Sequence, residues 1–449
     1  EANRKAMYRY LSRGDLDLDH ESFFAGIESL PGGHYLLLDH EGRGEPRRYW
    51  EPTACEVPGN RAHAIERFRE ILFDSIRIRL RSDVPVGSSL SGGIDSSSIV
   101  STINAQKTVQ WLHQKTFSAR FHSKAHDEGK FIKVVTHRVE AETHEVWVEP
   151  EQFIDAFERL QYHQEEPMAS ASPFAQWLVM QLARENDTTV LLDGQGADEI
   201  LAGYDQAHGM FLAHWLRLSA YGRRYRGIRE PALYAAYYSL PGTLRDGLVE
   251  RYYRSSKVVS EELHREFAPG HVDGPSPFPD RLRNELVRWQ TTTQLPEFLR
   301  YADRNSMAFS REVRLPFLDH RLAEYAFGLP PDLLLKGATT KVVLRESMRG
   351  IVPDGILDRK DKLAYAPPQH QWNHGPLRAW ILGKLQNAVR RGEFFNPETV
   401  REITAKFDSG GDDTLAWRIA SAEAWFETMV ERPALAAAAW ISPSSRLPV

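Results

Sequence analysis

Two spacings of apolar residues alternate along residues 61–192, and together they predict an α/β fold. Segments with the three-to-four-residue periodicity of amphipathic helices alternate with short apolar runs typical of strands. Helices are expected at 61–79, 99–106, 128–139, 152–160 and 174–184. Strands are expected at 85–89, 115–121, 143–148 and 188–192. This alternation favours a doubly wound parallel sheet, whose ligands bind beyond the carboxyl ends of its strands.

The pattern changes on both sides of this α/β region. Residues 206–440 read as mostly helical, and the Ala-, Pro- and Ser-rich end of the chain reads as a frayed tail. Residues 23–50 read as two short strands around a turn at Glu41 and Gly42. Two such strands cannot bury a core by themselves. Either more chain should precede them, or they pack on the domain that follows, and the pattern leaves both open.

Composition narrows the class of protein. The 449 residues are enough for two or three domains, and 26% charged with 42% hydrophobic residues is ordinary for a globular protein. A net charge of −5 gives no overall basic field, so we expect no nucleic-acid partner. No apolar run approaches the ~20 residues that span a bilayer, and no basic-then-apolar signal segment opens the chain. One cysteine, Cys55, permits no intrachain disulfide and is typical of a reducing compartment, so a cytoplasmic location is expected.

The segment after the strand at 85–89 carries the strongest chemical signal. It is rich in small polar residues, namely Ser91, Gly92, Gly93, Asp95, Ser96 and Ser97. Bare backbone N–H groups at a helix N-terminus bind anions, and serine hydroxyls add donors. A carboxylate among phosphates makes sense only if it holds a cation such as Mg²⁺, so we predict a nucleotide's phosphates with a metal. The alternative is a Ser/Gly turn that only connects a strand to a helix.

This segment differs from the two common types of phosphate-binding loop. It lacks the Gly-Lys-Ser/Thr ending of a Walker A loop and the G-x-G-x-x-G of dinucleotide-binding proteins. It is similar to the S-G-G-x-D-S loop of the ATP pyrophosphatase family, which cleaves ATP between the α and β phosphates.

A second acidic turn follows the strand at 188–192. Residues 193–199 read Asp-Gly-Gln-Gly-Ala-Asp-Glu, with two glycines and three acids. Acids beside a triphosphate repel it unless a metal intervenes. Asp95 and Asp198 each lie just past a strand end, so we predict that they share one Mg²⁺. The alternative is a solvent-exposed acidic turn.

Several spaced motifs resemble the synthetase half of the glutamine-dependent asparagine synthetase family. They appear in that family's order as SGGIDSS at 91–97, LLDGQGADEILAGY at 191–204, YADRNSMAFSREVRLPFLD at 301–319, KVVLR at 341–345 and RKDKLAYAP at 359–367. The resemblance runs from about residue 8 to 430, and the first fifty residues resemble the end of the family's glutaminase domain. It implies that residues 1–55 are a glutaminase remnant, 60–440 a synthetase domain and 441–449 a tail. Within the synthetase domain, residues 60–205 would form the nucleotide-binding core and 206–440 the helical part.

The resemblance also implies roles for individual residues. The pyrophosphate loop would consist of Leu90, Ser91, Gly92, Gly93, Ser96 and Ser97. Ala119, Asp193 and Gly194 would contact the nucleoside, and Asp95 and Asp198 would bind Mg²⁺. Lys362, rather than Lys360, would neutralise charge on the transferring phosphate. The arginines at 304, 311 and 314 are expected to be mainly architectural, with Glu312, Asp303 or Asp319 as partners.

Two departures from the family bear on the reaction. Gln195 stands where asparagine synthetases often carry Glu, and Gln can form hydrogen bonds but cannot act as a base. The family's glutaminase nucleophile is an N-terminal Cys, whereas this chain opens with Glu1 and Cys55 lies between the expected domains.

The resemblance implies an ATP-dependent ligase that makes asparagine from aspartate through β-aspartyl-AMP, with glutamine-derived or free ammonia. The alternative is a relative of the macrocyclases and β-lactam synthetases, which close an adenylated carboxylate onto an internal amine. A third reading is a non-catalytic binding relative. Small molecules are the expected partners, and a homodimer is compatible with the sequence.

Overall fold

The centre of the protein is a five-stranded parallel sheet. The computed structural model describes residues 1–106, 114–204, 207, 258–267, 276–337, 339–359 and 366–432. The strands lie in the order β5-β4-β3-β6-β7, and every neighbouring pair is parallel. They span Val86–Ser89 (β3), Lys115–Arg120 (β4), Glu142–Trp147 (β5), Val190–Leu192 (β6) and Glu312–Arg314 (β7). The first four lie where the apolar runs predicted them.

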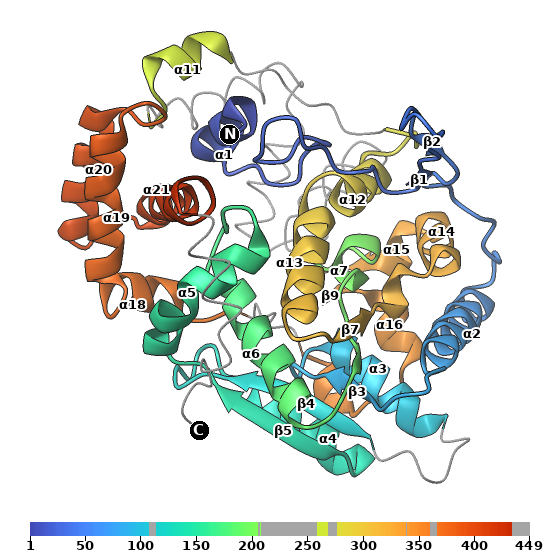
Figure 1. Ribbon diagram of the computed structural model, residues 1–449. Coiled ribbons are helices and arrows are strands. Elements are labelled where there is room, and N and C mark those ends of the chain that lie inside the picture. The colour runs from blue at the N-terminus through green and yellow to red at the C-terminus, as the bar shows by residue number, and fades with distance from the viewer. Residues whose placement is uncertain are drawn as a thin grey trace, which may run out of the picture.

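Helices cover both faces of this sheet (Figure 1). They are α2 (Arg61–Arg79), α3 (Ile94–Ala105), α4 (Gly129–Val139), α5 (Pro150–Gln164), α6 (Ser172–Glu185) and the short α7 (Ala197–Ile200). Successive side chains of a strand point to opposite faces, so Leu191 joins the core of α5 and α6, whereas Val190 and Leu192 join the core of α2, α3 and α4. The predicted doubly wound α/β fold is therefore confirmed.

Local sequence explains these elements well. Ala64, Phe68, Leu72 and Ile76 recur every four residues of α2 and are all buried, and the Asn60 side chain caps the first turn. In the central strand β3, a Cβ on Gly87 would lie 2.8 Å from the Phe117 ring and 3.0 Å from a Thr188 methyl. A larger residue there would force the neighbouring strands apart.

The second half of the described chain is mainly helical, as expected. Its helices are α11 (Glu261–Glu266), α12 (Arg281–Thr291), α13 (Gln294–Ala308), α14 (His320–Gly328), α15 (Pro331–Leu334), α16 (Val342–Ser347), α17 (Asp354–Leu357), α18 (Gln369–His374), α19 (Arg378–Arg391), α20 (Pro397–Asp408) and α21 (Thr414–Trp425). The short helical turns η1 (Pro316–Leu318) and η2 (Phe426–Glu431) and the two-residue strands β8 (Leu335–Lys336) and β9 (Thr339–Thr340) complete it. Helices α18 to α21 gather on one side of the molecule, at the left of Figure 1.

The N-terminal segment packs on this helical part. Helix α1 (Arg4–Arg13) is followed by β1 (His34–Tyr35) and β2 (Arg47–Arg48), which form a small antiparallel pair. Tyr10 packs on Phe23, and Phe23 on Trp425 of α21, so residues 4–23 share a core with α21. The two strands expected within 23–50 are thus present but very short. The structure does not test the assignment of residues 1–55 to a glutaminase remnant.

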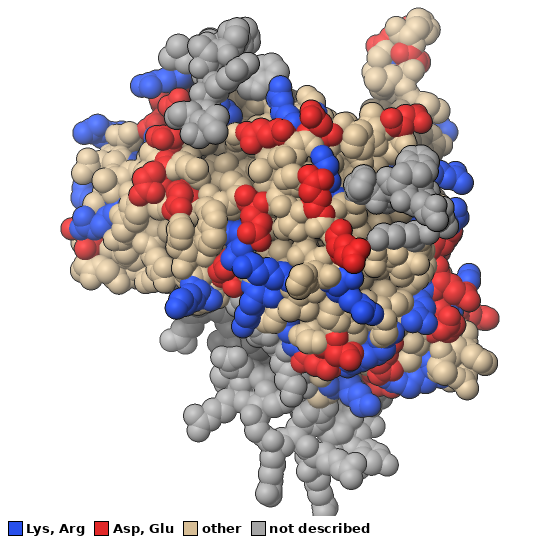
Figure 2. All heavy atoms as spheres, turned by 90° about the horizontal axis from the view of Figure 1, so that it is seen from below, with Lys and Arg blue, Asp and Glu red and all other residues tan. Residues whose placement is uncertain are grey.

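Surface and hydropathy add two observations. On the described part of the face in Figure 2, Lys and Arg side chains lie among Asp and Glu side chains. No helix within the described ranges is long and apolar enough to cross a membrane. The tail at 441–449 lies outside those ranges.

Candidate active site

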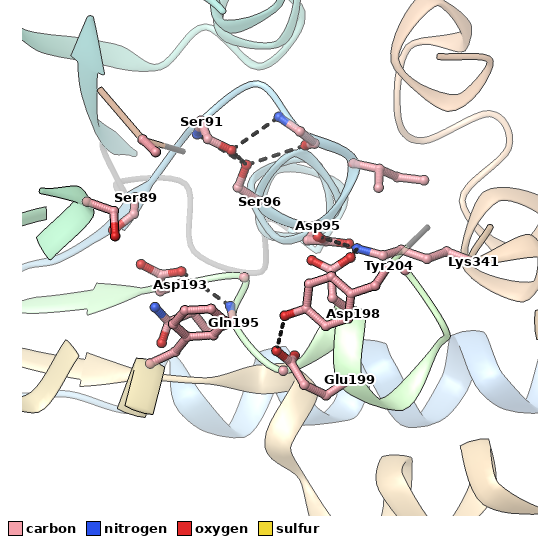
Figure 3. Close-up of a pocket in the computed structure, with 18 of the residues that line it drawn as sticks. Ser89, Ser91, Asp95, Ser96, Asp193, Gln195, Asp198, Glu199, Tyr204 and Lys341 are labelled. Atoms are coloured by element: carbon pink, nitrogen blue, oxygen red, sulfur yellow. Dashed lines mark hydrogen bonds and ion pairs between the residues drawn. The ribbon is translucent and has the colours of Figure 1, made fainter. Parts of the chain in front are cut away.

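The predicted phosphate loop joins β3 to α3. Its N-cap residue, Gly93, has no side chain to occupy the first N–H groups of the helix, so no capping side chain competes with an anion for them. Gly92 has φ +83°, a conformation that glycine adopts without strain. The Ser91 and Ser96 hydroxyls lie 3.2 Å apart, and Ser91 accepts a hydrogen bond from the Gly93 N–H (Figure 3). Glycine and serine together therefore hold the loop open around a set of donors.

This loop forms one wall of a cavity of about 620 Å³. Most of the residues singled out from the sequence line it, namely Leu90, Ser91, Gly93, Asp95, Ser96, Asp193, Gly194, Gln195 and Asp198. Three others do not line it: Gly92 packs against the start of α4, and Ser97 and Ala119 are buried in α3 and β4. Lys362 lies outside the described residues. The two strand-end segments thus converge as the parallel sheet requires.

The two aspartates predicted to share a metal meet at one point, and a lysine lies between them. Lys341 Nζ is 2.6 Å from Asp95 Oδ2 and 2.8 Å from Asp198 Oδ1 (Figure 3). Lys341 is the N-cap of α16 and is 3% exposed. Burial lowers the pKa of its ammonium, but the attraction of Asp198 and Asp95 outweighs burial and raises the pKa overall. Lys341 is therefore a charged group of the site.

The donor set is suited to Mg²⁺. Asp95 and Asp198 offer carboxylate oxygens, the ligand type that Mg²⁺ prefers, and both contact a single cation already. The Lys341 charge offsets one of the two negative charges, which leaves the trio with a net charge of −1. Mg²⁺ bound there would supply charge neutralisation to a polyphosphate, and Asp95 and Asp198 would hold it.

A buried acid, Glu199, directly follows Asp198, one of the two proposed metal ligands. Glu199 is 2% exposed and accepts a hydrogen bond of 2.5 Å from the Tyr204 hydroxyl. Burial, and then the charge of Asp198, raises the pKa of Glu199 to about 7. Burial also raises the pKa of Tyr204 above its usual range. This pair holds a proton close to the carboxylates at neutral pH.

Helix α13 contributes to the cavity lining another carboxyl group with a raised pKa, that of Glu297. Glu297 lines the cavity with Phe298 and Tyr301, beside the 169–172 loop. Burial raises the pKa of Glu297 to about 7, although the Tyr301 hydroxyl and Arg300 favour its charged form. An acid with that pKa exchanges protons readily at neutral pH, as a general base must. Sequence reasoning missed Glu297, because nothing in its local pattern separates it from an exposed helical glutamate.

Gln195 lies between these groups. Its backbone N–H donates to Asp193 Oδ1 at 3.3 Å. Its side-chain oxygen is buried, and no residue of the described ranges donates a hydrogen bond to it. Burial raises the pKa of Asp193, which the Ser89 hydroxyl and the Gly194 and Gln195 N–H groups partly stabilise in its charged form. Gln195 therefore lines the cavity with an amide, which forms hydrogen bonds but cannot act as a base.

Two arginines add positive charge to the lining of the cavity, namely Arg345 and Arg359. Arg359 pairs with Glu128 at 2.7 Å, donates to the Gly92 carbonyl at 3.0 Å and stacks over the Phe131 ring. Arg359 therefore braces the phosphate loop from outside.

The arginines within 301–319 have structural partners, as predicted. Arg304 pairs with Glu165 at 2.7 Å, and Arg311 donates to the Thr188 carbonyl at 2.9 Å. Arg314 pairs with Glu312 and also binds the Arg79 and Arg81 carbonyls. Asp319, one of the expected partners, pairs instead with Arg79 and Arg321. The same segment contains β7, which the sequence did not predict because three residues between two turns give no periodicity.

A parallel sheet, a glycine-serine loop at a helix N-terminus, and two converging aspartates define an α/β protein whose cavity is suited to nucleotide phosphates. Comparison with known proteins identifies the family. The asparagine synthase family model matches residues 67–427, and the chain belongs to that family. Membership implies an ATP-dependent enzyme of the ligase type.

Relatives of this chain include enzymes with different names. Asparagine synthetase [glutamine-hydrolyzing] 1 of Bacillus subtilis is 27% identical over 86% of this chain and 63% of its own length. Amidase chyE of Penicillium rubens and amidase chry2 of Gibberella zeae are each 27% identical over 81% of this chain and 62% of their own lengths. The chain thus spans about three-fifths of the curated relatives it matches.

One solved structure is also similar. A U34-tRNA thiolase from Methanococcus maripaludis aligns with a TM-score of 0.23 and 13% identity, over 55% of this chain and 80% of that chain. A score this low carries no argument about fold or function.

Proposed function

We propose that this chain activates a carboxylate with Mg-ATP and passes it to an amine, and that the carboxylate is the side chain of aspartate. The supporting observation is the cavity in which Asp95, Asp198 and Lys341 meet beside the open N-terminus of α3. A carboxylate oxygen attacks the α-phosphate, and the bond to the β-phosphate breaks so that pyrophosphate leaves with the electron pair. The amine nitrogen then attacks the acyl carbon of β-aspartyl-AMP, and AMP leaves as asparagine forms.

The side chains and backbone have distinct parts in this proposal. The N–H groups after Gly93 and the Ser91 and Ser96 hydroxyls hold the departing pyrophosphate. Asp95 and Asp198 hold the magnesium, and Lys341 keeps them from repelling the phosphates. Lys362 remains the proposed cation on the transferring phosphate, by resemblance. Gly194 and Asp193 border the nucleoside. The ammonia is proposed to be glutamine-derived or free.

Pyrophosphate release tests the proposal. We expect release that depends on ATP, Mg²⁺, aspartate and ammonia together, with AMP and asparagine formed in equal amounts. Asp95→Asn should abolish most of it, whereas Asp83→Asn, at an exposed position before β3, should not. ATP turnover that does not depend on aspartate would refute the substrate, and no turnover with any carboxylate would favour a binding relative.

One observation favours a second candidate, closure of an adenylated carboxylate onto an amine of the same molecule. Gln195 offers no charge to the acceptor, while Glu297 is a half-buried acid of the same cavity with a pKa of about 7. A base of that pKa suits removal of a proton from an attacking amine. Screening amino acids and short peptides for AMP formation without added ammonia separates the two candidates. AMP formation with a peptide and not with aspartate would replace the first candidate by the second.

A further inference from the structure

Two histidines and an aspartate form a cluster on the helical side of the molecule, remote in sequence from the phosphate loop. His370 and His374 lie four residues apart in α18 and so share one helix face. Asp413 precedes α21. One ligand atom from each of the three residues lies within 4.8 Å of the others. No other group of three or more His, Cys, Asp or Glu in the described ranges has this property.

The carboxylate of Asp413 is turned toward the histidines. Asp413 is the N-cap of α21, where an aspartate usually accepts the N–H of the first helical turn, yet its side chain makes no capping bond. Instead Asp413 Oδ2 lies 3.2 Å from His370 Nδ1 and accepts a hydrogen bond of 2.9 Å from Asn373 Nδ2. The side chain is 15% exposed, so the carboxylate is fixed in place.

The separations match a tetrahedral metal site. Zinc binds imidazole nitrogen and carboxylate oxygen at about 2.0–2.2 Å, so two ligands of a tetrahedral site lie about 3.3–3.6 Å apart. The distance of 3.2 Å between His370 Nδ1 and Asp413 Oδ2 is close to that edge. All three ligand atoms lie within 4.8 Å of one another, and His370 is the exposed member of the group, so a rotation of its side chain would bring the atoms closer.

The surroundings resemble the outer shell of a metal site. Metal-binding histidines usually give their second ring nitrogen to a carbonyl, which fixes the tautomer. His374 Nε2 lies 3.0 Å from the Gly411 carbonyl, and its ring packs on Phe407. Asn373 orients the carboxylate, and Asn373 Oδ1 in turn accepts from Gln369 Nε2 at 3.1 Å. Each of the two half-buried ligands, His374 and Asp413, therefore has its own hydrogen-bond partner.

We propose that His370, His374 and Asp413 bind one divalent transition-metal ion, for which Zn²⁺ is the best-matched probe. Two imidazoles and a carboxylate suit zinc and its neighbours and not Mg²⁺, which prefers oxygen ligands alone. The ion clamps α18 to the start of α21. Gln369 Oε1 accepts the Ala171 N–H at 2.7 Å, so the clamp also steadies the loop that borders the cavity.

The test is zinc binding by untagged, metal-depleted protein in excess Mg²⁺, measured by competition with a chromophoric chelator. We expect one Zn²⁺ per chain and a rise in the melting temperature on binding. Cobalt should give the visible d–d bands of a tetrahedral ion. His370→Ala should weaken zinc binding at least ~10-fold, as should Asn373→Ala through the carboxylate it orients.

Two controls keep the result interpretable. His122→Ala removes a histidine that also contacts a carboxylate, Glu149 at 2.6 Å, but belongs to no three-residue group, so it should bind zinc like the wild type. His370→Ala without metal should melt like the metal-free wild type, because the exposed ring packs on little else. Zinc binding that is absent, substoichiometric, or equal in the His370→Ala and wild-type proteins would overturn the proposal.

Discussion

Replacing Lys341 by methionine tests whether this buried cation balances the two site carboxylates. Methionine retains an unbranched side chain but removes the charge that lies 2.6 Å from Asp95 and 2.8 Å from Asp198. Removing one partner of a buried ion pair costs about 3–5 kcal/mol, because the remaining charge loses its compensation. The two aspartate side chains are 18% and 21% exposed, so water recovers part of this cost. We expect the free energy of unfolding to fall by about 3 kcal/mol.

Magnesium should distinguish this explanation from a simple packing defect. With Lys341 gone, two unopposed carboxylates should bind Mg²⁺ more tightly than in the wild type. An ion at a hundredfold its dissociation constant adds about 2.7 kcal/mol of stability, so Mg²⁺ should restore most of the loss. The assay is urea unfolding of wild type and variant in EDTA and in Mg²⁺.

Lys336→Met is the matched control, since Lys336 is an exposed lysine of β8 five residues earlier. It should unfold like the wild type in both buffers. The reasoning is refuted if Lys341→Met and Lys336→Met unfold alike in EDTA, or if Mg²⁺ stabilises Lys341→Met no more than it stabilises the wild type.

Three further predictions concern the same cavity. Asp95→Asn and Asp198→Asn should each lower turnover by at least ~10²-fold. The double variant should lose far less turnover than the product of the two single losses, because both residues act on one ion. Steady-state kinetics at several Mg²⁺ concentrations check this. The pKa of Glu297, about 7 in the folded chain against 4.5 as its ordinary value, means that the folded chain keeps a proton that the unfolded chain releases. Stability should therefore fall as pH rises from 4.5 to about 7, and Glu297→Gln should flatten that slope in unfolding experiments across this range. A Cβ on Gly203 would lie 1.9 Å from Asp198 Oδ1 and 2.2 Å from Lys341 Cε, so Gly203→Ala should weaken Mg-ATP binding, measured by calorimetry, while most of the fold survives.

The sequence by itself determined the α/β core. Apolar spacing places α2, four of the five sheet strands and the helices between them within a few residues of their positions in the structure, because these patterns depend on local backbone geometry. The turn that joins β3 to α3 was equally readable, since a run of small polar residues separates an apolar strand from a helix; its role as a phosphate loop stays a prediction. The convergence of Asp95 and Asp198 followed from topology, because neighbouring parallel strands end at one edge of the sheet.

Only the tertiary structure decided which side chains from distant parts of the sequence lie beside these residues. Lys341 lies 246 residues after Asp95 along the chain, and its role depends on the position of α16 against the sheet. The raised pKa of Glu297 comes from burial, which no local pattern of α13 reveals. Asp413 directly precedes α21, yet the position of α18 beside the start of α21 brings two histidines to its carboxylate. Local sequence sets backbone conformation, whereas the charge environment of a side chain depends on which distant segments pack around it.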